Sequence, residues 1–199
     1  MCSRHGPSIR SSQAGKIYLH LCHLLQAILT SHRLKLEGHF HLVVQSMESL
    51  LRCLFTPLPF SNATSSKFFS PPPWLPTTSA QLNTRHAAAF TRLLTLICNP
   101  SVSSVTRSQH NALTSATDKA KRMAGQHMQY VLMAYIRLQL EMKMTPAVRE
   151  QLIPGIYAIF DTTTPELRRA INEGMDGSGQ AVFRNLYADY TKFGKWKGS

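Results

Sequence analysis

The sequence predicts an all-α fold, an irregular antiparallel helical array that is solenoid-like and carries a long Pro/Ser/Thr-rich loop. The main observation is that apolar residues recur every three or four positions over several stretches, which is the period of one helix face. No comparable stretch alternates with the period of two that is typical of a strand. Short connections among the later helices favour antiparallel neighbours, and the absence of a repeat makes the array irregular.

The 199 residues are enough for one domain with its own core. We expect residues 1–13 to be a disordered polar segment and residues 14–199 to form a single helical domain. Two flexible insertions are expected within it, at 56–79 and at 99–117, because these stretches are polar and the first is dense in Pro, Ser and Thr.

Three helices are predicted in the first half of the chain. The second runs from about Phe40 to Leu54, and the third from about Phe90 to Ile97, where Asn99 before Pro100 disfavours further helix. The apolar face of the first is formed by Ile17, Leu21, Leu24, Leu25 and Ile28.

The later helices have clearer start and stop signals. Asp118 is a plausible N-cap for a helix that reaches Met142, and Thr145 and Thr164 are each followed by a proline suited to the first helical turn. The helix after Thr164 should end near Gly174. Pro154 lies inside an apolar stretch, so we expect a kink or two short helices there.

The last helix should carry one apolar side, formed by Phe183, Leu186, Tyr187, Tyr190 and Phe193. From these later helices we expect a structural core that includes Val131, Leu132, Tyr135, Tyr157, Phe183, Leu186, Tyr187 and Tyr190.

Charge is the unusual part of the composition. Twenty-two Lys and Arg against ten Asp and Glu give a formal net charge of +12, which draws polyanions toward the surface. The candidate RNA or partner contacts are Lys119, Lys121, Arg122, Arg168, Arg169, Lys192, Lys195, Trp196 and Lys197. Cations interleaved with aromatic rings can hold phosphates and stack bases, although each cluster can equally be a solvated helix face.

Nothing in the spacing of polar residues points to catalysis, a metal or a cofactor. The four cysteines form no close pair, and His20, Cys22 and His23 lack a further ligand at a suitable spacing. No paired carboxylates or nucleophile motif can be assembled, so we expect no enzyme and no small-molecule substrate. The apolar run from Ile17 to Leu29 is too short and too polar for a bilayer, and we expect an intracellular protein without membrane contact.

Several stretches together resemble a known family. They are residues 148–161 (VREQLIPGIYAIFD), 183–190 (FRNLYADY) and 193–197 (FGKWK), with weaker likeness at 32–36, 50–55 and 129–136. They are similar to the C-terminal domain of the nucleolar pre-ribosomal-associated protein two family, also called unhealthy ribosome biogenesis protein two. The likeness covers nearly all of the chain beyond about Ser31, and the chain would be a fragment, a truncated version or a shortened relative of a larger protein.

The resemblance implies a nucleolar factor in early large-subunit assembly and pre-rRNA processing. It also implies partners in the pre-ribosomal particle, including pre-rRNA, a companion scaffold and a DEAD-box helicase, and it brings no catalytic site. Our first hypothesis is therefore a non-catalytic scaffold or interaction module. The alternative is a direct, weakly sequence-specific RNA-binding protein that uses its basic helix faces, and a nuclease is a third hypothesis.

Overall fold

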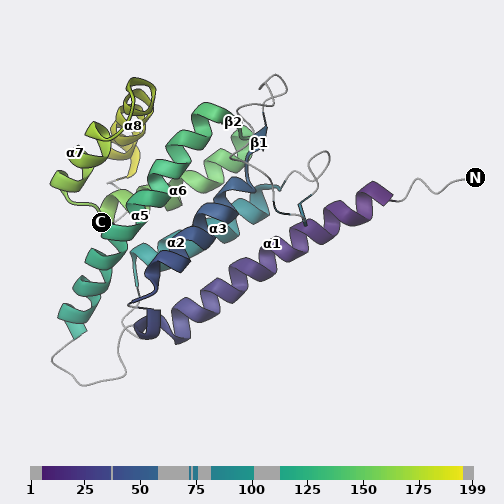
Figure 1. The fold of residues 1–199 in the computed structure, drawn as a ribbon, viewed down its shortest axis with the longest axis horizontal. Helices are drawn as coiled ribbons and strands as arrows, with labels where there is room; N and C mark the ends of the chain where they lie inside the picture. Colours follow the sequence, from purple (N-terminus) through teal and green to yellow (C-terminus); the bar gives the residue numbers. More distant parts are fainter. Residues whose placement is uncertain are drawn as a thin grey trace, which may run out of the picture.

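The computed structural model describes residues 6–36, 38–57, 72, 74–75, 82–100 and 113–194 (Figure 1). The α-helices are α1 (Gly6–Ser31), α2 (Phe40–Arg52), α3 (Thr84–Cys98), α5 (Leu113–Glu141), α6 (Pro146–Thr162), α7 (Pro165–Glu173) and α8 (Gly177–Asp189). A 3-10 helix, η1, spans Arg33–Leu36, and a π-helical turn, η3, spans Tyr190–Gly194. The predicted all-α class is confirmed.

The one sheet in the described part of the chain is a two-residue ladder between β1 (Thr56–Pro57) and β2 (Met142–Lys143). The strands are antiparallel and pair Thr56 with Lys143 and Pro57 with Met142. The ladder fastens the end of α2 to the end of α5. Most of the two predicted insertions, namely residues 58–71, 73, 76–79 and 101–112, lies outside the described residues.

Helices α3 and α5 hold the array together. Helix α3 makes its most extensive contact with α6 and also packs against α1 and α5, while α5 contacts α2, α6 and α8. In Figure 1, α1 lies along one edge of the molecule, and α7 and α8 lie at the opposite edge. The surfaces discussed below lie on α5, on α7 and η3, and between α2, α5 and α8.

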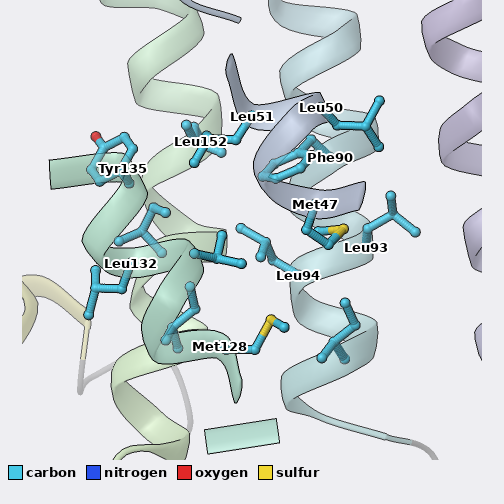
Figure 2. Close-up of a cluster of buried hydrophobic side chains, with 14 of the residues drawn as sticks. Met47, Leu50, Leu51, Phe90, Leu93, Leu94, Met128, Leu132, Tyr135 and Leu152 are labelled. Atoms are coloured by element: carbon cyan, nitrogen blue, oxygen red, sulfur yellow. The ribbon is translucent and has the colours of Figure 1, made fainter. Parts of the chain in front are cut away.

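One continuous hydrophobic core runs through the array, from Tyr18 in α1 to Tyr190 in η3. Figure 2 shows its centre, where apolar side chains of four helices converge. The labelled residues there are Met47, Leu50 and Leu51 of α2, Phe90, Leu93 and Leu94 of α3, Met128, Leu132 and Tyr135 of α5, and Leu152 of α6. Removing so much apolar surface from water is the main stabilising contribution to the fold.

Two start signals of the later helices, at Thr145 and Thr164, lie where the sequence predicts them. Thr164 accepts a hydrogen bond from the Leu167 amide (3.2 Å), and Pro146 occupies the first turn of α6 after Thr145. Helix α7 ends at Gly174, as expected. The Thr164 side chain satisfies a backbone amide that the helix itself leaves unpaired, whereas the Thr145 side chain makes no such bond.

Helix α1 differs from the prediction in two ways. It begins at Gly6, ahead of residue 14 where we expect the helical domain to start, in keeping with the proline that follows Gly6 and favours a first helical turn. Its buried side chains are Ala14, Tyr18, Cys22 and Leu29, whereas Ile17 is 38% exposed and Leu24 is 57% exposed.

The reason for this rotated face is a close approach between α1 and α3. The ring centroids of Tyr18 and His86 lie 5.6 Å apart, and a Cβ at Gly15 would lie only 2.7 Å from Nε2 of His86. Gly15 leaves room for the His86 ring at this crossing, so packing against α3 decides which side of α1 is buried.

The structure differs from the sequence-based expectation in three further details. Helix α5 begins at Leu113, so Asp118 lies inside it and is not its N-cap; no Gly or Pro interrupts the chain between the two. Helix α6 continues through Pro154 as one helix and does not divide into two. Phe193 is 56% exposed because the wider π-turn of η3 rotates it out of the apolar side of α8.

Packing against α3 explains the continuity of α6. The Thr91 hydroxyl donates to the carbonyl of Gln151 (2.6 Å), in the turn before Pro154. Gly155 then lets the two helices approach, since a Cβ there would lie 2.9 Å from Cδ1 of Leu94. These contacts hold both sides of the proline in one helix.

Candidate interaction surfaces

The first basic cluster opens helix α5. Lys119, Lys121 and Arg122 are all exposed there. One turn later, α5 crosses the C-terminal end of α6 so closely that a Cβ at Gly125 would collide with the Thr162 carbonyl. The cluster therefore lies in the part of α5 that approaches the end of α6.

The second cluster, on α7, meets the same end of α6, but its two arginines differ. Arg168 is half-buried, and its Nη1 donates to the carbonyls of Phe160 (3.2 Å) and Thr163 (2.8 Å). Its guanidinium also lies 5.3 Å from the centroid of the Tyr187 ring. Arg168 thus caps the carbonyl end of α6, where the helix dipole favours a cation, while Arg169 is exposed.

The third cluster lies at the end of the chain. Lys192 is exposed, and its Nζ lies 4.9 Å from the centroid of the Phe193 ring. Lys195, Trp196 and Lys197 lie outside the described residues. The structure thus brings the α5 and α7 clusters to one end of α6.

Aromatic side chains join α6 to α8 and η3 beside these clusters. Phe160 lies at the centre of this aromatic group. The centroid of its ring is 5.1 Å from that of Tyr190, 5.5 Å from that of Tyr187 and 5.8 Å from that of Phe183. Of the expected core residues, six are buried: Val131, Leu132, Tyr135, Phe183, Leu186 and Tyr190. Tyr157 and Tyr187 are half-buried.

Asp161, the single acid between Pro154 and Thr164, is part of this packing. The Tyr190 hydroxyl donates to Oδ1 of Asp161 at 2.5 Å. Burial, and then this hydrogen bond, raise the pKa of Tyr190 to about 12. The carboxylate therefore has a structural partner across the α6–η3 contact.

A buried cation closes the end of α3. Arg33 is only 3% exposed and donates from Nη1 to the Leu96 carbonyl (3.0 Å) and from Nη2 to the Ile97 carbonyl (2.5 Å). Burial lowers the pKa of Arg33 from its ordinary value. The last carbonyls of a helix lack intrahelical donors, so Arg33 supplies them and ties η1 to α3.

The structure also contains a surface groove that we did not predict from the sequence. It has a volume of about 480 Å³, and its floor is the second half of α5. Its walls are the end of α2 and the start of α8 with the residues just before it. Tyr130 and Leu140 of the floor are 51% and 42% exposed, so two large apolar side chains lie open to solvent in one groove.

A signal for the groove is visible in the sequence once the structure is known. Tyr130, Met133, Arg137 and Leu140 repeat every three or four residues, beside the stripe that packs into the core. Helix α5 therefore has a second, largely apolar stripe beside the one that packs into the core. The core stripe alone would be enough to pack the helix against its neighbours.

Other kinds of site are not assembled in the part of the chain that the structure describes. No group of three or more His, Cys, Asp or Glu side chains there is arranged to hold a metal ion. His20 and His23 are exposed, while Cys22 is buried. Within the same residues, no helix combines the length and the apolar character needed to cross a membrane.

Fold and surfaces together define a basic all-helical protein with cationic helix faces and a groove that is partly apolar. The chain belongs to the Urb2/Npa2 family, whose pattern it matches over residues 2–199. It is similar to the probable nucleolar pre-ribosomal-associated protein 2 of Schizosaccharomyces pombe, with 21% identity over 183 residues. That match covers 90% of this chain and 13% of the length of the relative. No solved structure closely matches this chain.

Proposed function

We propose that this chain is a non-catalytic scaffold in ribosome biogenesis, where it acts in early large-subunit assembly and pre-rRNA processing in the nucleolus. Family membership supports a role in ribosome biogenesis, and the name of the fission-yeast relative supports a nucleolar, pre-ribosomal setting. We extend the proposal to the companion scaffold and the DEAD-box helicase expected from the resemblance. A single solenoid-like domain over residues 14–199, with its long loop, belongs to the same proposal.

The observation that carries the proposal is the way the described side chains are used. Arg168 is a candidate contact in the sequence, yet it is bound to carbonyls within the fold, and the charged groups of Asp161 and Arg33 are likewise bound to a hydroxyl and to carbonyls. In the described part of the chain, the surface includes helix faces with cations and the α2–α5–α8 groove. Such faces suit contacts with large partners.

The alternative function is direct, weakly sequence-specific RNA binding. It is favoured by the exposed cations Lys121, Arg122 and Arg169 on two helices that meet at the end of α6. In that case the cations themselves would carry the activity, and not a partner protein.

A salt series distinguishes the two. Direct phosphate contacts release counterions, so the logarithm of affinity falls with the logarithm of salt by roughly 0.7 to 0.9 for each contact. We expect filter binding to a large-subunit pre-rRNA fragment to be weak and to vanish near physiological salt, while the chain stays with purified pre-ribosomal particles. Tight RNA binding that follows the steep salt law, with Lys121→Gln and Arg122→Gln weakening it, would favour the alternative instead.

A further inference from the structure

We propose that the α2–α5–α8 groove is a docking site for an amphipathic helix of a protein partner, with an apolar stripe flanked by Lys or Arg. The inference deepens the proposed function and rests on it, since it names the surface and the kind of partner through which the scaffold acts. The groove is formed by Tyr130, Met133 and Leu140 on its floor and by Glu48, Glu141 and Asp176 among its charged residues.

The shape of the groove fits a helix. From Tyr130 to Glu141 the floor helix rises roughly 16 Å at about 1.5 Å per residue, or three turns. Its side chains repeat at helical spacing, so they present a ridge pattern that a second helix can interlock with. Binding an amphipathic helix in a groove between helices is a recurrent mode of recognition between proteins.

The apolar content of the groove supports the same occupant. Tyr130 and Leu140 expose about half of their surface, and Met133 and Met175 are half-buried beside them. Tyrosine is a frequent energetic anchor of interfaces, and methionine adapts its shape to different partners. A docked helix would remove this apolar surface from water.

Charge determines which helix fits. Three acids and two bases line the groove, so its own net charge is slightly negative on a chain that carries +12. Arg137 already pairs with Glu141 through Nε and Oε1 at 2.8 Å. Glu48 is half-buried, and this partial burial raises the pKa of its carboxyl, with Arg52 acting in the opposite direction. A polyanion such as RNA is disfavoured here, whereas a basic flank gains from the acids.

The test uses two synthetic helical peptides of about 18 residues, long enough to fill the groove. Both carry the same leucine stripe, and one has Lys flanks while the other has Glu flanks. The overall charge of the chain favours the Glu-flanked peptide at any other surface, so a preference for the Lys-flanked peptide reports the local field of the groove. We expect fluorescence anisotropy to show the Lys-flanked peptide binding at least about tenfold more tightly.

Matched variants locate the binding. Tyr130→Ser with Leu140→Ser should weaken the Lys-flanked peptide by about tenfold or more, because it removes the apolar anchors. Leu24→Ser with Leu42→Ser removes two equally exposed apolar residues outside the groove (57% and 52% exposed) and should change nothing. As a second pair that leaves the apolar floor intact, Glu48→Gln with Glu141→Gln should reduce the preference for Lys flanks, whereas Glu150→Gln on α6 should not.

Four results would overturn the inference. They are equal binding of the two peptides, equal binding by the groove variant, displacement of the peptide by a single-stranded RNA oligonucleotide, and a wild-type dimer in sedimentation equilibrium that the groove variant dissolves. The last would make a second copy of the chain the occupant. If the chain associates with pre-ribosomal particles but ignores the peptides, this inference fails alone; if it does not associate at all, the proposed function fails.

Discussion

The helix crossings can be tested by placing one methyl group at three glycines. In the interior of a helix, Gly→Ala normally stabilises by about 1 kcal/mol because alanine loses less conformational entropy. The sign should reverse where the new Cβ has no room. The structure supplies a graded series of such positions at Gly125, Gly155 and Gly177.

The expected order follows from what the Cβ would meet. At Gly125 it would collide with the Thr162 carbonyl, which is backbone and cannot turn away. At Gly155 it would lie 2.9 Å from the flexible Cδ1 of Leu94 and 3.2 Å from Cα of Thr91. At Gly177 nothing lies within 4 Å. Overpacking costs about 1 to 3 kcal/mol and sometimes more.

After the propensity gain is subtracted, Gly125→Ala should lose about 2 kcal/mol or more, and Gly155→Ala about 1. Gly177→Ala serves as the matched control and should be neutral or slightly stabilising. For a chain of this size each kcal/mol shifts Tm by roughly 2 to 4 °C, so calorimetry should resolve the order. A Gly125→Ala variant that melts at or above wild type would refute the α5–α6 crossing described above.

The remaining predictions concern single contacts. Arg33→Lys should cost about 2 kcal/mol in urea unfolding, because one ammonium cannot replace two guanidinium donors; an unchanged midpoint would contradict that role. Tyr190→Phe should lower the free energy of unfolding by about 1 kcal/mol, because it loses the hydrogen bond to the solvent-exposed Asp161. A free energy of unfolding equal to that of the wild type would count against this bond. Burial raises the pKa of three thiols to about 12, those of Cys22, Cys53 and Cys98. The folded state therefore holds these protons more tightly than the unfolded chain, so stability should be full below about pH 9 and fall as pH rises toward 12, by up to about 1.4 kcal/mol per pH unit for Cys98. Urea midpoints that stay level to pH 11 would disprove this. Lys195→Glu with Lys197→Glu should leave the melting temperature unchanged and weaken co-sedimentation with pre-ribosomal particles, and wild-type co-sedimentation would argue against a basic terminal contact.

Signals confined to a few neighbouring residues were predictable from the sequence. Thr164 with Pro165 and the stop at Gly174 depend on local backbone groups, and each has the same role in the structure. The buried stripe of α5 was also visible, because Val131, Leu132 and Tyr135 have the period of one helix face.

Features that depend on a second helix were not predictable. The buried face of α1 is chosen by the approach of Gly15 to His86, which are far apart in the sequence. The continuity of α6 through Pro154 likewise depends on Thr91 in α3. Tertiary contacts override local propensity in both cases.

The candidate surfaces divide in the same way. Composition indicates a cationic exterior, but it cannot show that Arg168 is bound to carbonyls while Arg169 is exposed. The groove is formed by three helices, so the sequence alone reveals only the part contributed by α5, the second stripe with Tyr130 and Leu140.

Gradient sedimentation of the tagged chain in nuclear extract tests the scaffold function most directly. The gradients are run at low and at physiological salt, and each fraction is probed for large- and small-subunit pre-rRNA. We predict that the chain travels with large-subunit precursors at both salt concentrations, because protein contacts hold it there. Sedimentation with the free proteins, or release into those fractions at physiological salt, would contradict a scaffold held by protein partners.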